Sequence, residues 1–195
     1  MKEETLKRIF EFLEEKEEHN KPLKLKLIFN EPLTEEELNV KGNLNLEFAK
    51  ITSLPEGLKV SGFLSLFESK ITSLPEGLKI RGYLDLRKTN ITSLPEGLEV
   101  GGNVFLNNTD ITSLPEGLKV GGSLNLSRLD ITSLPKGLKV GGYLDIRYTK
   151  ITSLPKGLEV GDFFMIGFTP IAKYSDEELR EMIKPGFIKG QIERD

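Results

Sequence analysis

The chain contains no cysteine and no tryptophan, and it has one histidine. Without cysteine there can be no disulfide framework, no cysteine zinc site and no thiol nucleophile. A single histidine excludes a multi-histidine metal site and leaves little room for Ser-His chemistry. We therefore expect a protein that is not an enzyme, with no catalytic residues, no metal ligands and no cofactor.

Neither charge sign dominates, and long apolar runs are missing. The 195 residues carry 27 Lys and Arg against 30 Asp and Glu, a net charge of −3. A dedicated nucleic-acid binder would usually be basic. No run of 18 apolar residues could span a bilayer, and Met1–Glu4 begins no apolar signal core. The sequence predicts a cytoplasmic protein that binds neither nucleic acid nor membrane.

Glycine and proline, in contrast, are abundant, at 19 and 10 residues. Six of the prolines and six of the glycines belong to an octapeptide, Ile-Thr-Ser-Leu-Pro-(Glu/Lys)-Gly-Leu. It begins six times, always 20 residues apart, at Ile51, Ile71, Ile91, Ile111, Ile131 and Ile151. A fixed period of this length indicates a solenoid, in which stacked coils bury a continuous core. Gly and Pro then serve as corner residues rather than as linker material.

Within one repeat, the apolar residues alternate where a short strand is expected. Leu84 and Leu86 would point inward, with Tyr83, Asp85 and Arg87 pointing outward. Gly residues that precede each such strand indicate a corner, and the Leu-Pro-Glu-Gly-Leu segment indicates a second one. Stacked coils would pair these strands in parallel, at a spacing of about 4.8 Å.

These residues resemble the leucine-rich repeat family in its short variant. The family pattern is Leu-x-x-Leu-x-Leu-x-x-Asn-x-Leu followed by x-x-Leu-Pro. Two repeats that match it contribute Leu84, Leu86, Thr89, Ile91, Leu94, Pro95 and Leu144, Ile146, Thr149, Ile151, Leu154, Pro155. The match covers roughly residues 41–170 and looks like the compact repeats of bacterial effectors and of uncharacterised bacterial and phage proteins.

Two positions depart from the family pattern. The first Leu is replaced by Lys41, Ser61, Arg81 or Gly101, and the Asn is mostly Thr. The resemblance implies an α/β solenoid of leucine-rich-repeat type. Its parallel sheet would have about seven 20-residue coils, with little helix in the repeats and helical caps at both ends. Effector-type relatives carry ubiquitin-ligase domains with a catalytic cysteine, which this chain lacks.

The two ends differ from the repeats, as terminal repeats of solenoids do. Apolar residues on one face predict a helix over 5–18, and alternation predicts a strand over 23–27. Ser175–Glu178 reads as a capping box that opens a helix ending at about Lys184, with a short strand over 187–192. We expect one cooperative domain, made of an N-terminal cap and degenerate coil (1–40), the solenoid (41–170) and a C-terminal cap (171–195).

The outward strand positions are the candidate binding face. They vary between coils, whereas the corner and core residues barely change. Aromatic and Arg side chains there suit an interface with an unknown protein partner. The residues predicted to contact it are Phe63, Phe67, Tyr83, Asp85, Arg87, Phe105, Tyr143, Asp145, Arg147 and Phe163. The competing interpretation is that the aromatics pair along the sheet and only cover the strands.

Other roles fit the sequence less well. Asp85 and Asp145 lie three coils apart, or roughly 14 Å, too far for a carboxylate pair of the glycosidase kind. Each has an Arg two residues later, which predicts a simple ion pair. Asp110 and Asp130 offer too few oxygens for Ca²⁺. We expect a monomeric binding module, the alternatives being a self-associating spacer or a Thr ladder that orders water.

Overall fold

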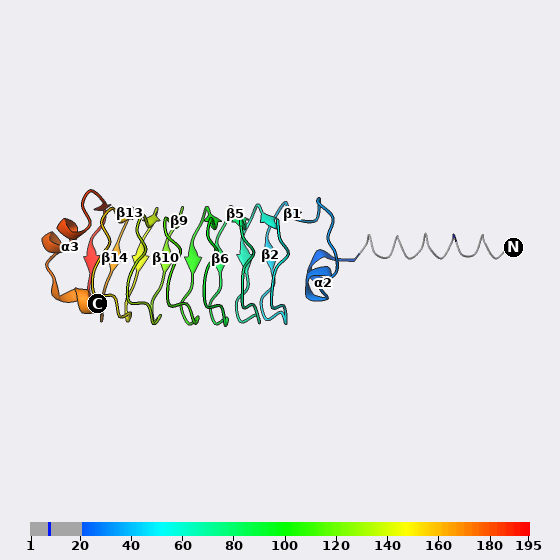
Figure 1. Cartoon of the computed structure of the whole chain (residues 1–195), viewed down its shortest axis with the longest axis horizontal. Helices are drawn as coiled ribbons and strands as arrows, with labels where there is room; N and C mark the ends of the chain where they lie inside the picture. Colours follow the sequence, from blue (N-terminus) through cyan, green and yellow to red (C-terminus); the bar gives the residue numbers. More distant parts are fainter. Residues whose placement is uncertain (1–7, 9–20) are drawn as a thin grey trace.

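The computed structural model describes residue 8 and residues 21–195. Over this part the chain winds into a parallel β-solenoid of about six turns with little helix (Figure 1). Two-residue strands from successive turns and from the segments at both ends form two eight-stranded parallel sheets. Sheet A contains β1 (Asn39–Val40), β3 (Lys59–Val60), β5 (Lys79–Ile80), β7 (Glu99–Val100), β9 (Lys119–Val120), β11 (Lys139–Val140), β13 (Glu159–Val160) and β15 (Phe187–Ile188). Sheet B contains β2 (Leu44–Asn45), β4 (Leu64–Ser65), β6 (Leu84–Asp85), β8 (Val104–Phe105), β10 (Leu124–Asn125), β12 (Leu144–Asp145), β14 (Phe164–Met165) and β16 (Ile192–Glu193).

The pairing register repeats the period of the sequence. Leu84 of β6 pairs with Val104 of β8, and Asn39 of β1 pairs with Lys59 of β3. Six such steps of 20 residues lead from Asn39 to Glu159. The next step, from Glu159 to Phe187, includes the C-terminal helices. The prediction of about seven coils therefore counted one turn too many, because the coils at the two ends are not full 20-residue turns.

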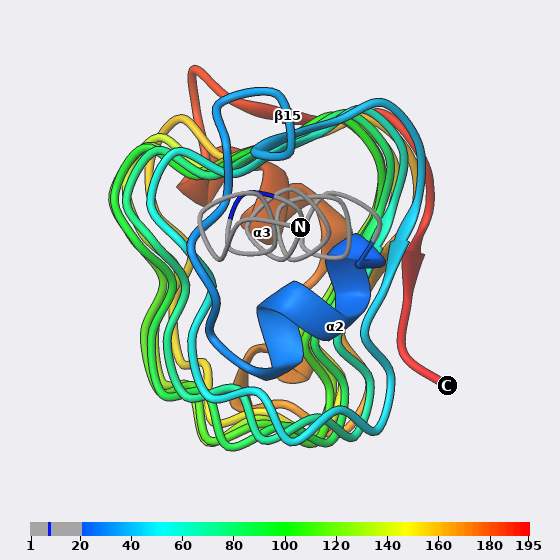
Figure 2. The ribbon, with the colours of Figure 1, turned by 90° about the vertical axis from the view of Figure 1, so that its right-hand side faces the viewer.

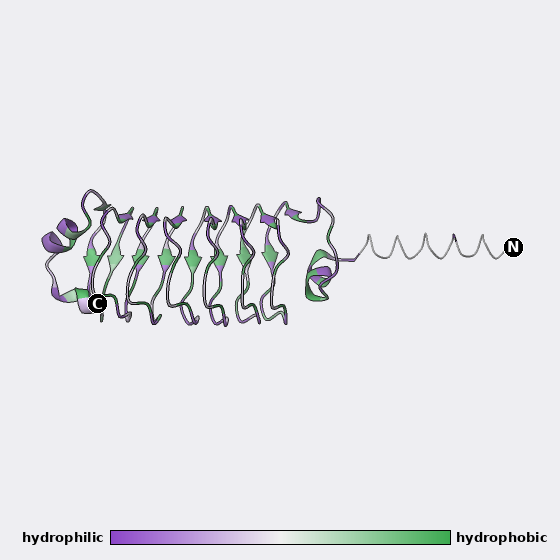
Figure 3. Cartoon of the chain, in the orientation of Figure 1, coloured by the Kyte–Doolittle hydropathy of each residue, from purple (hydrophilic) through white to green (hydrophobic). Residues whose placement is uncertain are grey.

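The core lies between the sheets and is built from the repeated Leu, Ile and Val positions. Leu84, Leu86 and Ile91 are completely buried, and the equivalent residues of the other coils join them in one cluster. In Figure 3 the sheet B strands are accordingly coloured as apolar, whereas the sheet A strands also show the hydrophilic colour of their outward residues. Viewed down the solenoid, the coils lie over one another in outline (Figure 2). The sequence predicted this periodic core correctly.

A row of side-chain to backbone hydrogen bonds lies just after the sheet B strands. The hydroxyl of Thr89 donates to the carbonyl of Leu86, at 2.7 Å, and Thr109, Thr149 and Thr169 make the same bond three residues back. Thr89 and Thr149 are buried, so these bonds satisfy hydroxyls that would otherwise lose free energy on leaving water. This is the role of Thr at the position where the leucine-rich repeat pattern has Asn.

The N-terminal end of the described chain forms a helix where a strand was expected. Residues Leu23–Ile28 form α2, which lies across the end of the solenoid (Figure 2). Leu and Lys are good helix formers, and Pro22 is tolerated just before the first turn. Leu27 is buried, and Lys26 pairs with Glu37 at 2.7 Å, which lowers the pKa of Glu37. The Leu-Lys alternation was therefore a misleading strand signal, and the helix predicted at 5–18 lies outside the described residues.

At the C-terminal end the chain forms the 3₁₀ helix η1 (Pro170–Lys173) and then α3 (Asp176–Met182). The capping box is present: Ser175 Oγ accepts from the Glu178 amide at 3.2 Å, and the Glu178 carboxylate accepts from the Ser175 amide at 2.8 Å. Two short strands follow instead of the single one expected. β15 joins sheet A and β16 joins sheet B, so the last turn still serves both sheets.

One glycine row allows the coils to approach closely enough to stack. A Cβ on Gly82 would lie 2.7 Å from the carbonyl of Gly62, whereas a Cβ on Gly77 would meet nothing within 4 Å. We expect Gly82→Ala to lower the free energy of unfolding by about 3 kcal/mol. Gly77→Ala, which only strains a φ of +65°, should cost about 1 kcal/mol. Urea unfolding of both variants measures the difference, and equal losses would show that coil contact is not the constraint.

Candidate functional site

The candidate residues lie on the outward face of sheet B, in two groups. Each coil presents the residue before the strand, the second strand residue and the residue two places further on, because the side chains between them point into the core. One group comprises Phe63, Phe67, Tyr83, Asp85, Arg87 and Phe105, on the coils of β4, β6 and β8; the other comprises Tyr143, Asp145, Arg147 and Phe163, on the coils of β12 and β14. Small polar residues of the β10 coil separate the groups.

The first group forms one continuous set of contacts. Phe63 stacks on Tyr83 with ring centroids 4.6 Å apart, and Tyr83 meets Phe105 edge-on at 6.2 Å. The guanidinium of Arg87 lies 5.3 Å from the Phe67 ring and 5.4 Å from the Phe105 ring. We call these residues, with Asp85, the aromatic cluster. All but Asp85 are half-buried, so the rings cover the strands and still expose part of their surface.

Asp85 and Asp145 do not lie on the surface, contrary to the expectation that they contact a partner. Asp85 is 4 % exposed and Asp145 is 1 % exposed. Arg87 covers Asp85 through its Nε, at 2.9 Å, and its Nη2, at 2.6 Å, and Arg147 holds Asp145 in the same way. The predicted ion pairs are thus confirmed, and each carboxylate positions its arginine.

These contacts shape the electrostatics of the aromatic cluster. The hydrogen bonds that Arg87 donates to Asp85 raise the pKa of Arg87, so its guanidinium stays charged. Burial raises the pKa of the Tyr83 hydroxyl, and the negative charges of Asp85 and Glu47 raise it further. Tyr83 is therefore a neutral hydrogen-bonding group at neutral pH. The cluster offers a protonated Arg beside aromatic rings and a neutral phenol.

Beside sheet B runs a row of side chains that the sequence analysis did not single out. Seven residues spaced 20 apart along the chain have φ between 52° and 64°. We call this row the αL ridge; its members are Phe48, Glu68, Lys88, Asn108, Arg128, Tyr148 and Phe168. Only Gly and Asn adopt this conformation readily. Because the residue types differ so widely along the row, no sequence signal marked it.

The αL ridge carries the most exposed aromatic rings of this side. Tyr148 stacks on Phe168 at 4.6 Å, and the Arg128 guanidinium lies 4.6 Å from the Tyr148 ring. Phe48 and Phe168 are 64 % and 68 % exposed. A left-handed conformation costs such residues roughly 1–2 kcal/mol each, and exposed rings return little of that free energy to the fold. Backbone strain of this kind is typical of functional positions.

Other candidate chemistries find little support in the described residues. Residues 21–195 and residue 8 contain no group of three or more His, Cys, Asp or Glu that could hold a metal ion. Asp130 is paired with Lys150 at 2.7 Å. The Thr row at Thr52 and its equivalents is exposed, and Thr72 donates to the Thr52 carbonyl at 3.2 Å. None of the helices in this part of the chain has both the length and the apolar character needed to cross a bilayer.

Removing Arg87 should expose its supporting role. Arg87→Ala leaves the buried Asp85 carboxylate without its main partner, so we expect the free energy of unfolding to fall by about 2 kcal/mol. The double change Asp85→Ser with Arg87→Phe reproduces Ser65 and Phe67 of the preceding coil and should recover most of that loss. Chemical denaturation of the three proteins tests this. A single variant as stable as the wild type would contradict it.

Comparison with known proteins adds no relative to this picture. No protein-family model matches the chain, and no curated protein gives a match.

Proposed function

We propose that this chain is a non-enzymatic protein-binding module, which contacts its partner through the outward face of sheet B and the adjoining αL ridge. The observation that carries the proposal is the aromatic cluster. Tyr, Phe and Arg are the residue types that dominate binding energy at protein interfaces, especially when neighbouring groups shield them from water. Here they form one connected patch on a scaffold whose other positions repeat almost without change.

The rigidity of the patch supports this function. Arg87 is held by Asp85 and lies between two rings, and Tyr83 lies between Phe63 and Phe105. Side chains that are already ordered lose less conformational entropy when a partner binds. Binding then retains more of the free energy of the contacts, which suits a surface built from a few side chains.

We further propose that the solenoid is of the leucine-rich-repeat type, with helices that cap its two ends. In support, the residues that match the family pattern are the buried ones, and Thr89 and its equivalents make a regular bond at the Asn position. α2 and α3 each bury a leucine, Leu27 and Leu179. Covering the terminal coils in this way protects sheet edges that would otherwise pair with other chains.

Substitution by a residue that another coil has at the same position tests the binding face without disturbing the fold. Phe63, Tyr83 and Phe105 can each be changed to Asn, since Asn43, Asn103 and Asn125 occupy the same positions elsewhere. A partner recovered with the wild type from source cells would be purified and its affinity measured by calorimetry. We expect the triple variant to bind it at least about 100-fold more weakly, because hot-spot residues each contribute about 2 kcal/mol.

The matched control changes Tyr143, Phe163 and Met165 to Asn on the second group. It removes similar apolar surface from the same face, and its binding should fall by less than about 10-fold. If both triple variants bind the partner as the wild type does, the outward face of sheet B is not the interface. If only the control loses binding, the contact lies at β12 and β14 instead.

Self-association is the second candidate, and one observation favours it. The large apolar side chains that are most exposed gather near the two ends of the described solenoid: Leu25, Phe29, Phe48, Tyr148, Phe163, Phe168 and Phe187. A spacer that assembles end to end would use them. Sedimentation velocity between low and high micromolar concentrations discriminates the two functions. The binding module should remain a monomer throughout, whereas a concentration-dependent rise in mass would favour the spacer.

A further inference from the structure

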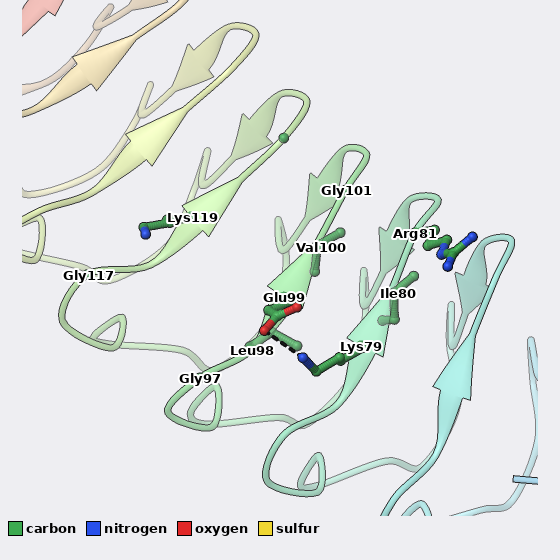
Figure 4. A pocket seen from close by; sticks show the side chains of 11 residues that line it. Lys79, Ile80, Arg81, Gly97, Leu98, Glu99, Val100, Gly101, Gly117 and Lys119 are labelled. Carbon is green, nitrogen blue, oxygen red and sulfur yellow. Dashed lines mark hydrogen bonds and ion pairs between the residues drawn. The ribbon is translucent and has the colours of Figure 1, made fainter. Parts of the chain in front are cut away.

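The outward face of sheet A, away from the proposed interface, is hollowed along the solenoid. A larger hollow of about 750 Å³ lies over β5, β7 and β9 (Figure 4), and a smaller one of about 270 Å³ lies over β9, β11, β13 and β15. Lys119 and Gly121 line both, so the two form one shallow groove. We call it the sheet A groove.

Glycines at both ends of the strands leave parts of this face without side chains. Around β7, Leu98 and Val100 are buried in the core and Glu99 is exposed, with Gly97 and Gly101 on either side. A Cβ at Gly121 would collide with the carbonyl of Gly101, and one at Gly141 would collide with that of Gly121. Side chains are therefore excluded from these two positions. The bottom of the groove is backbone there, and the charged side chains of the strands project above it.

The charges of the sheet A groove oppose those of the whole protein. Five cations, Lys79, Arg81, Lys119, Lys139 and Lys189, and two carboxylates, Glu99 and Glu159, line it, so its net charge is +3 in a chain of net charge −3. Glu99 pairs with Lys79 at 2.8 Å, and Glu159 pairs with Lys139 at 2.6 Å. Among the described residues, Arg81, Lys119 and Lys189 form no ion pair.

A departure from the repeat adds positive charge at the corners that lead into β11 and β13. The corner that leads into each sheet A strand carries Glu in four repeats, at Glu56, Glu76, Glu96 and Glu116. In the last two repeats the same position is Lys136 and Lys156, both exposed, and no other residue of the octapeptide changes. Because both residue types fold equally well here, this change has no evident structural cause.

An apolar contact point lies at the same end. Phe187, in β15, is 41 % exposed and lines the smaller hollow. Lys189 lies 5.4 Å from its ring centroid. An exposed ring beside unpaired lysines suits a ligand that has both carboxylates and an apolar side chain, which describes an acidic peptide better than a simple anion.

We propose that the sheet A groove docks an acidic, extended segment of a partner protein, independently of the sheet B interface. A nucleic acid fits less well, because Glu99 and Glu159 interrupt the row of cations and would face its phosphates. The groove would recognise the side chains of the segment, because its own backbone groups are already hydrogen-bonded between coils. The Gly121 amide donates to the Val100 carbonyl and the Gly141 amide to the Val120 carbonyl, both at 2.9 Å. The carboxylates would meet Lys119, Lys136, Lys156 and Lys189.

A charge reversal that the chain itself contains elsewhere tests the proposal. Lys136→Glu with Lys156→Glu restores the octapeptide of the first four repeats, so the variant should fold. The probe is a fluorescein-labelled decapeptide of alternating Glu and Gly with one central Phe, and its binding is followed by anisotropy at low salt. We expect the double variant to bind this peptide at least 10-fold more weakly than the wild type.

The matched control is Lys50→Glu with Lys70→Glu, which changes the net charge equally on exposed residues outside the groove. It should change the affinity less than 2-fold. Equal losses in both double variants, or no binding of the peptide to the wild type, would overturn the proposal. So would an oligothymidylate that binds more tightly than the peptide and is displaced by the Lys136 and Lys156 changes. The Asn triple variant of sheet B should bind the peptide as tightly as the wild type does. The peptide test can therefore fail without affecting the proposed function, and the reverse also holds.

Discussion

The whole architecture depends on hydrogen bonds between backbone groups of neighbouring coils, 19 to 21 residues apart in the chain. The amide of Gly102 donates to the carbonyl of Gly82 at 3.0 Å, and the amide of Leu84 donates to Asn103 at 2.8 Å. Such bonds require the coils to lie at strand spacing all the way round, not only within the two-residue strands. Any residue whose Cβ would enter that space is excluded, which is why Gly82 and Gly102 cannot vary.

This constraint separates the roles of inside and outside. Inward side chains must fill the same space in every coil, so Leu, Ile and Val recur there with little variation. Outward side chains face only solvent and the coils on either side, and they interact along the solenoid axis. The Phe63–Tyr83 stack, the Tyr148–Phe168 stack and the Lys139–Glu159 pair all join residues near 20 apart. A surface assembled from such neighbours can differ along its length without any change in the core.

The sequence predicted well whatever the period controls. The solenoid, the inward positions, the parallel pairing and the Asp85–Arg87 ion pair all follow from residues at fixed spacing. It failed where the period ends. Leu23–Ile28 alternates like a strand but forms the helix α2, because Leu and Lys are good helix formers. It also missed the αL ridge, because a positive φ at Lys88 or Tyr148 is imposed by how the coil closes and leaves no mark on residue type. The burial of Asp85 was likewise invisible, since it depends on Arg87 folding back over it.

In a chain whose coils are nearly copies, a deviation carries information that composition cannot. Where the same backbone accepts Glu at position 116 and Lys at position 136, the fold is indifferent to the choice, and the surface potential is what changes. The αL ridge leads to the same conclusion from the energetic side. Gly occupies the left-handed corner at Gly57 and its equivalents, whereas the ridge keeps Phe48, Arg128 and Tyr148 at a conformational cost. The bulky side chains kept at these strained, exposed positions are consistent with the proposed contact with a partner. The two faces then differ in kind. Sheet B presents ordered rings beside Arg87 and Arg147, whose charges are already paired, whereas sheet A presents Arg81, Lys119 and Lys189, which form no ion pair among the described residues.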